Sequence, residues 1–397
     1  MGFDPSNTPF TSLGKLFTDT NPSEIKHLPK SIFQNKAVEL RILAKKNDGQ
    51  HCKEGGDLVL VELKAPTGNT TVGKVRDVGD GSYVALLVAA QVGEAMLTVS
   101  INGQRIKGSP FPIKITNNYY QAIDKPTKII EYEKLGQCWG VGFGDKGVWG
   151  VADYSNHCVH LFDGHNQDQF IRSISTKGSG NSEFNGPISL AFDNDSCLYV
   201  VDTNNHRVQK FNKEGEFMLA FGSEGSGDKQ LKFPFGITTH NSRVYIADSQ
   251  NRRISVFRFD SHFCTSFGSE WLGDPEDVTV NIHNQLLVTD YEHHCIHIFQ
   301  LDGHYITKFG VQGSDRGQLH HPRSLTSDSN GHILVVDHNH RVSVFDKDGN
   351  FIHCFGSNGS KEGQFSSPYG IAISPKDGIH VCDHLNNRVQ IFSIVLD

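Results

Sequence analysis

The sequence has no apolar run near the roughly 18 residues that a membrane-spanning helix needs, and its N-terminus has neither the basic patch nor the apolar core of a signal peptide. Its 8 cysteines are scattered without a C-x-x-C pair, which argues against a structural zinc site and a disulfide framework. Apart from the opening segment, no amphipathic helical period is sustained for three turns. We therefore expect a cytoplasmic protein with reduced cysteines and few helices.

Glycine is abundant instead, at 40 of 397 residues, and with the missing helical periodicity it predicts a mostly β protein. The length of the chain predicts two or three domains. Charge divides the chain at Lys125-Pro126. Residues 1–126 carry 15 basic and 12 acidic groups, a net +3. Residues 127–397 carry 22 basic and 32 acidic groups, a net −10, and 19 of the 21 histidines. This acidic region has no general attraction to nucleic acid.

One pattern recurs six times in the second region: an apolar pair, Asp, a polar turn that often contains His or Arg, and an apolar strand ending in Phe. The copies are VADYSNHCVHLF, VVDTNNHRVQKF, IADSQNRRISVF, VTDYEHHCIHIF, VVDHNHRVSVF and VCDHLNNRVQIF. Their aspartates are Asp153, Asp202, Asp248, Asp290, Asp337 and Asp383, spaced by 42 to 49 residues. Such a period allows four short strands, a to d, per unit. The repeat predicts a six-bladed β-propeller.

The sixth blade has room for strands a, b and c only, because SIVLD alone follows Phe392. Residues 127–133 (TKIIEYE) alternate suitably, and we predict that they pair with the sixth c strand and close the ring. The fifth blade has one residue fewer in its b–c turn. The third blade is followed by SEWLGDP, which lacks the G-x-x-x-G-Q-F/L turn and predicts a tight connection.

Short alternating stretches between residues 24 and 117, such as AVELRILA and SYVALLVA, are separated by the turn signals DGQ, PTGN, VGDGS and NGQ. About seven strands in this length predict an immunoglobulin-like sandwich. We thus expect an all-β chain with a flexible lead-in over 1–23, the sandwich over 24–117, a linker over 118–126 and the propeller over 127–397.

Two segments of the first domain, Val78–Tyr83 (VGDGSY) and Gly108–Pro112 (GSPFP), resemble the filamin-type immunoglobulin repeat, whose signatures are D-x-G-D-G-x-Y and G-S-P-F. The six copies, above all Asp202–Phe211 (DTNNHRVQKF) with Gly349–Phe365, resemble NHL repeats. This combination is similar to the C-terminal half of TRIM-NHL (tripartite motif) proteins. The resemblance implies a propeller that recruits proteins or RNA, in a family whose RING, B-boxes and coiled coil supply ubiquitin ligase activity. This chain has neither the zinc spacing nor the heptads of those regions, so we do not expect it to be a ligase itself.

Strand alternation places the d–a and b–c loops on one face of a propeller, where a rigid scaffold presents recognition residues. The residue entering each a strand lies nearest the central channel, which gives Trp139, Ile188, Phe235, Glu276, Arg323 and Tyr369. Around this ring the b–c turns supply His157, His206, Arg207, Arg252, Arg253, His293, His294, His340, Arg341 and Arg388. We predict that a partner binds here, and the resemblance implies the same face.

These residues allow two interpretations. Aromatic rings stack on bases for ~1–3 kcal/mol each and arginine pairs with phosphate, so the face would suit an RNA stem-loop or single strand, although Glu276 opposes this. In the structural interpretation, each repeat Asp binds backbone amides of its own b–c turn, and the turn His or Arg packs against the neighbouring blade. Trp139, Phe235 and Tyr369 would then pack the channel.

Three functions follow. Recruitment of a protein, such as a ubiquitination substrate, is favoured by the net −10 charge of the propeller. RNA binding that represses the bound transcript is the second. A propeller lyase or lactonase is the third and has little support, because the ring offers Glu276 as its only metal-ligating residue, and adjacent His293 and His294 should diverge. With no G-x-S-x-G, Walker A or H-E-x-x-H motif, we expect no catalysis, cofactor or metal, and no DNA or membrane partner.

Overall fold

The computed structural model describes residues 23–393 apart from gaps at 27, 29–30, 34–36, 47, 66, 92, 117–119, 121–122, 124, 145–146 and 376–377. The expected lead-in therefore lies almost wholly outside the described residues, as does much of the expected linker. The chain divides into two units, Met1–Tyr119 and Tyr120–Asp397. Both are built from strands, and no helix within the described ranges is long and apolar enough to cross a membrane.

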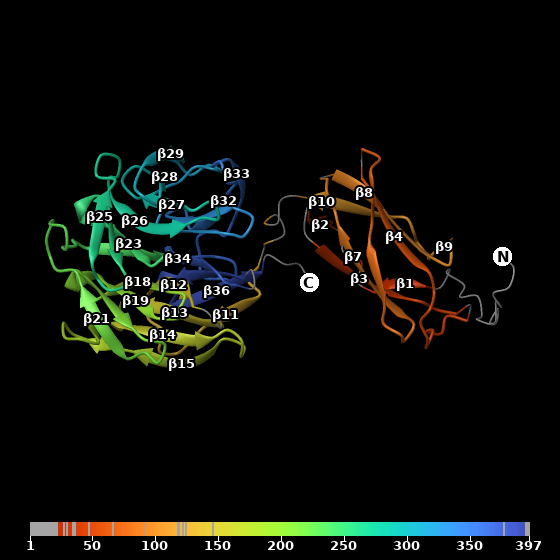
Figure 1. The fold of residues 1–397 in the computed structure, drawn as a ribbon, viewed down its shortest axis with the longest axis horizontal. Helices are drawn as coiled ribbons and strands as arrows, with labels where there is room; N and C mark the ends of the chain where they lie inside the picture. Colours follow the sequence, from red (N-terminus) through yellow and green to blue (C-terminus); the bar gives the residue numbers. More distant parts are fainter. Residues whose placement is uncertain are drawn as a thin grey trace, which may run out of the picture. The chain divides into compact units, whose positions relative to one another are not determined.

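The first unit is a sandwich of two sheets (Figure 1). One has the order β1-β3-β7-β6, with the bounds Glu24–Lys26, Ala37–Leu43, Ser82–Val88 and Lys74–Asp77. The other has the order β2-β10-β8-β4-β5 with β9 beside β8, and the bounds Ser31–Phe33, Phe111–Thr116, Gly93–Ile101, Val59–Lys64, Thr70–Val72 and Gln104–Arg105. Inward-facing aliphatic residues of both sheets form one core. The sequence prediction of a sandwich is confirmed, with more and shorter strands than expected.

The VGDGSY motif lies where the turn before β7 passes close to the backbone of Cys52 in the sandwich. Gly81 has a φ of +79°, and a Cβ added there would lie 1.9 Å from the carbonyl oxygen of Cys52. Tyr83 is 1% exposed, and its hydroxyl donates a hydrogen bond to Asp57 Oδ2 (3.0 Å). Glycine is required by the backbone at this turn, and the tyrosine anchors the turn in the core.

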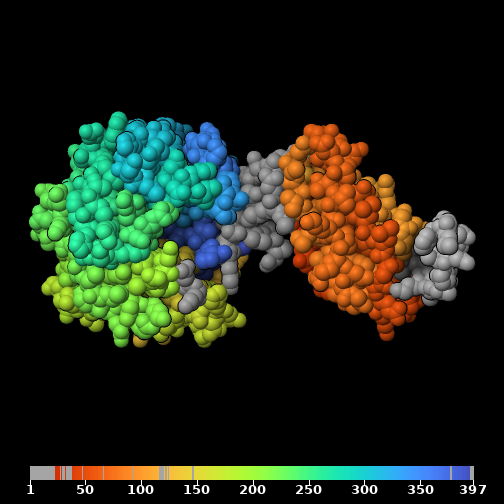
Figure 2. Space-filling view, viewed as in Figure 1, coloured from red at the N-terminus to blue at the C-terminus, as the bar shows by residue number. Residues whose placement is uncertain are grey.

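The second unit is a propeller of six four-stranded antiparallel sheets (Figure 1), and the surface colours in Figure 2 follow the chain around its ring. Blade one is β12–β15, with the bounds Cys138–Phe143, Val148–Asp153, Cys158–Asp163 and Gln169–Ile174. Blade two is β18–β21, with the bounds Pro187–Phe192, Leu198–Asp202, Arg207–Phe211 and Phe217–Phe221. Blade three is β22–β25, with the bounds Pro234–His240, Arg243–Asp248, Arg253–Arg258 and Phe263–Phe267. Blades four and five are β26–β29 (Pro275–Val280, Gln285–Asp290, Cys295–Gln300, Tyr305–Phe309) and β30–β33 (Ser324–Ser327, Ile333–Asp337, Arg341–Phe345, Phe351–Phe355). The six a strands are neighbours in a closed circle around the channel.

The sixth blade is completed by a strand from the start of the unit, as the sequence predicts. Its order is β11-β36-β35-β34, with the bounds Lys128–Ile130, Arg388–Ser393, Gly378–Asp383 and Pro368–Ile373. β11 is antiparallel to β36, with Ile130 opposite Val389, and the amide of Thr127 donates to the carbonyl of Ile391 (2.7 Å). Ile130 packs into the core that holds Trp149. The ring is therefore closed by pairing of its two ends.

The connection after the third blade is tight, as the sequence predicts, because the amides of Trp271 and Leu272 both donate to the carbonyl of Gly268.

Tyr120 precedes the first blade and lies in the segment expected as a linker, yet its side chain is fully buried in the propeller unit. Its hydroxyl donates to Asp328 Oδ2 (2.9 Å), and its ring meets His332 edge-on.

Candidate functional site

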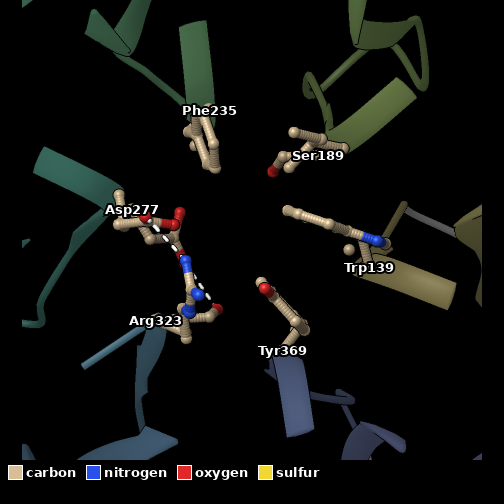
Figure 3. Close-up of a pocket in the computed structure, with 12 residues that line it drawn as sticks. Trp139, Ser189, Phe235, Asp277, Arg323 and Tyr369 are labelled. Carbon is tan, nitrogen blue, oxygen red and sulfur yellow. Dashed lines mark hydrogen bonds and ion pairs between the residues drawn. The ribbon is translucent and has the colours of Figure 1, made fainter. Parts of the chain in front are cut away.

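The six residues predicted to enter the a strands line one pocket, which we call the channel mouth (Figure 3). The mouth has an empty volume of about 280 Å³ and is lined by Trp139, Ile188, Phe235, Glu276, Arg323 and Tyr369 together with the residue that follows each of them. In five blades the pairing of strands a and b shifts register at this position. Such β-bulges bend the strand and re-aim its side chains. This explains why the second residue of the a strand points into the mouth in these five blades.

Glycine follows the aromatic residue in three blades because neighbouring a strands nearly touch there. A Cβ on Gly140 would lie 2.4 Å from the carbonyl oxygen of Ile188, and one on Gly370 would lie 2.3 Å from that of Trp139. At Gly236 it would lie 2.3 Å from Asp277 Oδ1. The sequence pattern aromatic-Gly thus marks the narrowest part of the ring.

Three aromatic side chains line the mouth, with Trp139 and Tyr369 side by side and Phe235 across the mouth from Tyr369 (Figure 3). Trp139 stacks on Tyr369 with ring centroids 4.0 Å apart, and Phe235 is tilted 6.1 Å from Trp139. Tyr154 stacks on Trp139 at 5.0 Å, and His384 meets it edge-on at 5.3 Å. These rings form a continuous apolar surface at the centre of the face.

Arg323 lies beside Tyr369 (Figure 3) and is held in four directions. Its Nη1 donates to Glu276 Oε1 (2.8 Å) and its Nε donates to His338 Nε2 (3.0 Å). Its guanidinium carbon lies 4.4 Å from the ring centroid of Tyr291 and 4.5 Å from that of Tyr369. The arginine therefore organises the mouth, with two of its N–H groups donated to Glu276 and His338.

Burial shifts the ionisation of the groups around Arg323. It raises the pKa of Glu276 to about 8, although Arg323 acts in the opposite direction. It also raises the pKa of Asp277 to about 6, against hydrogen bonds from Ser324 and two backbone amides. Burial and the nearby Arg323 lower the pKa of His338 to about 4, so its Nε2 stays available as an acceptor. The charge of the mouth changes near neutral pH.

The residue after each repeat Asp forms a second ring around the mouth, which the sequence prediction missed. Its members are Tyr154, Thr203, Ser249, Tyr291, His338 and His384. The tyrosines and histidines of this ring contact Trp139 or Arg323, whereas Thr203 Oγ1 donates to the carbonyl of Pro234 (2.8 Å). The repeat carries the signal that could have found them, because they stand at one fixed position in every copy.

The predicted turn arginines are bound within their own blades. In three blades the Nε of the arginine donates to the repeat Asp, in the pairs Arg207–Asp202 (2.8 Å), Arg253–Asp248 (2.8 Å) and Arg388–Asp383 (2.7 Å). Other N–H groups of these arginines donate to backbone carbonyls of the preceding d–a loop, and so do Nη1 and Nη2 of Arg341. Partner contact by these four residues stays a prediction, but their contacts show a structural role.

The turn histidines and Arg252 connect each blade to the next. His206 and His340 have φ values of +53° and +57°, and their Nδ1 atoms accept hydrogen bonds from the amides of Phe233 (3.1 Å) and Ser367 (2.9 Å). His157 and His294 make the same contact with Gly186 and His321. Arg252 stands at the equivalent position and donates to the carbonyl of Gly273 (3.0 Å).

The repeat Asp makes a longer connection than the sequence predicts. All six are 0% exposed, and each accepts a hydrogen bond from a backbone amide of the d–a loop 16 or 17 residues earlier, as well as contacts within its own turn. The donors are Gly136, Asn185, Lys232, Gly273, His320 and Ser366. The Asp therefore ties the two loops of one blade together, which fixes the face that carries the mouth.

Comparison with known proteins identifies both units. The Filamin/ABP280 repeat family model matches residues 19–112, and the NHL repeat model matches residues 184–211 and 272–299. Tripartite motif-containing protein 2 of Ailuropoda melanoleuca is 33% identical over 184 residues, which is 46% of this chain and 24% of the relative. E3 ubiquitin-protein ligase TRIM71 of Xenopus tropicalis is 32% identical over 139 residues, 34% of this chain and 17% of the relative. The matched segments thus span a quarter or less of these relatives.

Solved structures support the fold alone. A protein of unknown function from Bacteroides thetaiotaomicron has a TM-score of 0.56 at 13% identity and covers 94% of this chain and 98% of its own. A streptogramin B lyase has a TM-score of 0.51 at 11% identity, over 67% of this chain and 96% of its own.

The likeness to NHL-repeat relatives supports a protein-interaction propeller. The chain carries a filamin repeat followed by NHL repeats, and in this it resembles the C-terminal half of the TRIM-NHL proteins.

Proposed function

We propose that the propeller is a non-catalytic module that recruits a protein partner at the channel mouth, and that this partner is a substrate for ubiquitin ligation. The observation that carries the proposal is the aromatic surface of Trp139, Phe235 and Tyr369 at the centre of the face. Central, concave clusters of aromatic residues are typical of protein-binding hot spots. The link to ubiquitin ligation rests on the relative named as an E3 ubiquitin-protein ligase.

The state of the arginines favours a protein over RNA. Phosphate recognition needs guanidinium groups with unused donors. Arg207, Arg253 and Arg388 are each paired with a repeat Asp and also bind loop carbonyls, and Arg323 is paired with Glu276 and bound to His338. The face is therefore less cationic than its composition indicates.

Alanine substitution of two mouth residues tests the proposal. The full chain with Phe235→Ala and Tyr369→Ala would be compared with the wild type by crosslinking in cells and quantitative mass spectrometry. Met218→Ala is the matched control, because Met218 is an apolar residue of the outer strand β21 that is 50% exposed. Loss of a hot spot of about 2 kcal/mol should lower the affinity of the true partner roughly 30-fold. An unchanged set of crosslinked proteins would reject the mouth as the site.

RNA binding keeps one observation in its favour, since the same aromatic rings could stack on bases and the side chain of Arg252, in the b–c turn of blade three, is 56% exposed although it pairs with Glu292. Fluorescence anisotropy against RNA stem-loops and single strands, titrated across salt, separates the two functions. Saturable binding that weakens with salt and is lost in the Phe235 and Tyr369 variant would place RNA first. No binding at low salt would leave protein recruitment.

A further inference from the structure

Strand c begins differently in two of the six blades. Arginine is the first residue in blades two, three, five and six, whereas Cys158 and Cys295 stand there in blades one and four. Two residues later the first group has Gln or Ser, and the second group has His160 and His297. The repeat Asp, which an arginine binds in blades two, three and six, therefore faces a thiol and an imidazole in blades one and four.

Blade four brings three potential metal-ligating side chains together, and a fourth, Cys295, lies beside one of them. His293 Nδ1 is 2.9 Å from Asp290 Oδ2, and His297 Nε2 is 3.3 Å from the same oxygen. Cys295 Sγ is 3.4 Å from His297 Nε2. Ligand atoms of Asp290, His293 and His297 all lie within 4.8 Å of one another. Asp290, Cys295 and His297 are buried, while the side chain of His293 is 43% exposed and leaves a route from solvent.

These distances and donors suit zinc. A tetrahedral zinc ion with bonds of roughly 2.0–2.3 Å holds its ligand atoms roughly 3.3–3.8 Å apart. Carboxylate, imidazole and thiolate are all zinc ligands, and the thiolate disfavours magnesium and calcium. Asp290, His293 and His297 already lie within 4.8 Å of one another, and reorientation of the Cys295 side chain towards them would complete a four-coordinate site.

We propose that Asp290, His293, Cys295 and His297 bind one zinc ion in blade four, which revises the expectation of no metal. The ion fastens the b–c turn to strand c, as arginine does in blades two, three and six. Tyr291 lies within the same turn and stacks on Arg323, so the ion also fixes one wall of the channel mouth. This site is distinct from the mouth and does not depend on the proposed partner.

Blade one provides an internal comparison. Asp153, Cys158 and His160 form the same cluster, with His160 Nε2 3.1 Å from Asp153 Oδ2 and 3.5 Å from Cys158 Sγ. Asn156 stands where blade four has His293, and it donates to Asp153 Oδ2 (2.7 Å) instead. With three donors rather than four, blade one should bind metal more weakly.

Cobalt substitution tests the assignment without any need for a biological activity. The full chain would be treated with a chelator, dialysed and titrated with Co²⁺, whose visible spectrum reports tetrahedral geometry and whose near-ultraviolet charge-transfer band reports a thiolate ligand. We expect one equivalent of Co²⁺ with both signals and its displacement by Zn²⁺. Saturating zinc should also raise the melting temperature by about 5 °C.

Four variants identify the ligands. His293→Asn, which copies blade one at an exposed position, and Cys295→Ser should both weaken binding, and Cys295→Ser should remove the charge-transfer band. Cys158→Ser should leave both signals intact, and Asn156→His should add a second equivalent. A wild-type chain that binds no Co²⁺, or a band that survives Cys295→Ser and disappears with Cys158→Ser, would overturn the proposal. Melting curves of the chelated variants confirm that each remains folded.

Discussion

Arg323 and Tyr369 stack at the channel mouth, with the guanidinium carbon 4.5 Å from the ring centroid. Arg323 immediately precedes β30 in the fifth blade, and Tyr369 lies in β34 of the sixth. The bond from Arg323 to Glu276 reaches β26 of the fourth blade. One side chain thus links three consecutive blades at the point where their strands converge.

Replacement of Arg323 should therefore destabilise the propeller. Above about pH 8, where Glu276 is ionised, Arg323→Ala leaves this buried carboxylate without its cationic partner and should lower the free energy of unfolding by about 3 kcal/mol. Arg323→Lys should recover only part of this, because lysine lacks the planar fork that stacks and donates in two directions. Urea denaturation measures both changes. Arg316→Ala, at an exposed loop residue, serves as the control, and an equal loss there would refute the linking role.

Stability should depend on the ionisation of Glu276. Its pKa is about 8 in the folded chain against 4.5 ordinarily, so the folded state binds this proton more tightly. The resulting stabilisation is complete below about pH 4.5 and disappears as the pH rises through about 8. Between pH 6 and 8.5 the wild-type melting temperature should fall more than that of Glu276→Gln, which cannot titrate. Parallel pH profiles for the two chains would show that burial does not hold the proton on Glu276.

The fifth blade lacks two hydrogen bonds to its repeat Asp, because its b–c turn is one residue shorter than the others. Arg341 Nε and Ser343 Oγ are buried without a hydrogen-bond partner, whereas the equivalent atoms of Arg253 and Ser255 both bind Asp248. Inserting one Asn after Asn339 would give DHNNHRVSVF, which matches the spacing of DTNNHRVQKF in blade two. Restoring the bonds to Asp337 should raise stability by about 1 kcal/mol.

Calorimetry of the insertion variant measures this gain. The same insertion after Asn205 in blade two, where the turn is already complete, should lower the melting temperature. If the two insertions have equal effects, turn length does not account for the unpartnered atoms of blade five.

The sequence was sufficient to predict which residues line the channel mouth, but not which groups the surrounding turn residues contact. A repeat of fixed spacing identifies the start of each a strand, so Trp139, Phe235 and Tyr369 could be placed in one ring. The partners of Arg207 could not be predicted, because the carbonyls of Gly180 and Glu183 that it binds lie 27 and 24 residues earlier in a loop without a side-chain signal. Backbone acceptors leave no trace in the sequence, and an arginine in a polar turn has the same pattern whether it faces solvent or its own blade.

The inter-blade contact of His206 allows a structural role to be separated from a binding role. His206→Ala removes the acceptor for the amide of Phe233 and places alanine at a φ of +53°, so it should cost about 1–2 kcal/mol. His206→Asn should cost less, since Asn387 occupies the equivalent position with a φ of +52°. Thermal melts of both variants give the stability, and partner titration gives the affinity. A lower affinity in His206→Asn at unchanged stability would assign His206 to the partner instead.

Ring closure by β11 should prevent self-association through the edge of β36. Ile130 is 8% exposed and packs with Val389 and Trp149, so Ile130→Lys should detach β11 and expose the edge of β36, which offers unpaired backbone groups to another chain. Light scattering should then report self-association, and hydrogen exchange should show lost protection in both strands. Glu131→Lys, at the exposed neighbouring position, should change neither. If the Ile130→Lys chain does not self-associate and its β36 amides stay protected, the sixth blade is stable with three strands. Its c strand would then need no partner from the start of the unit.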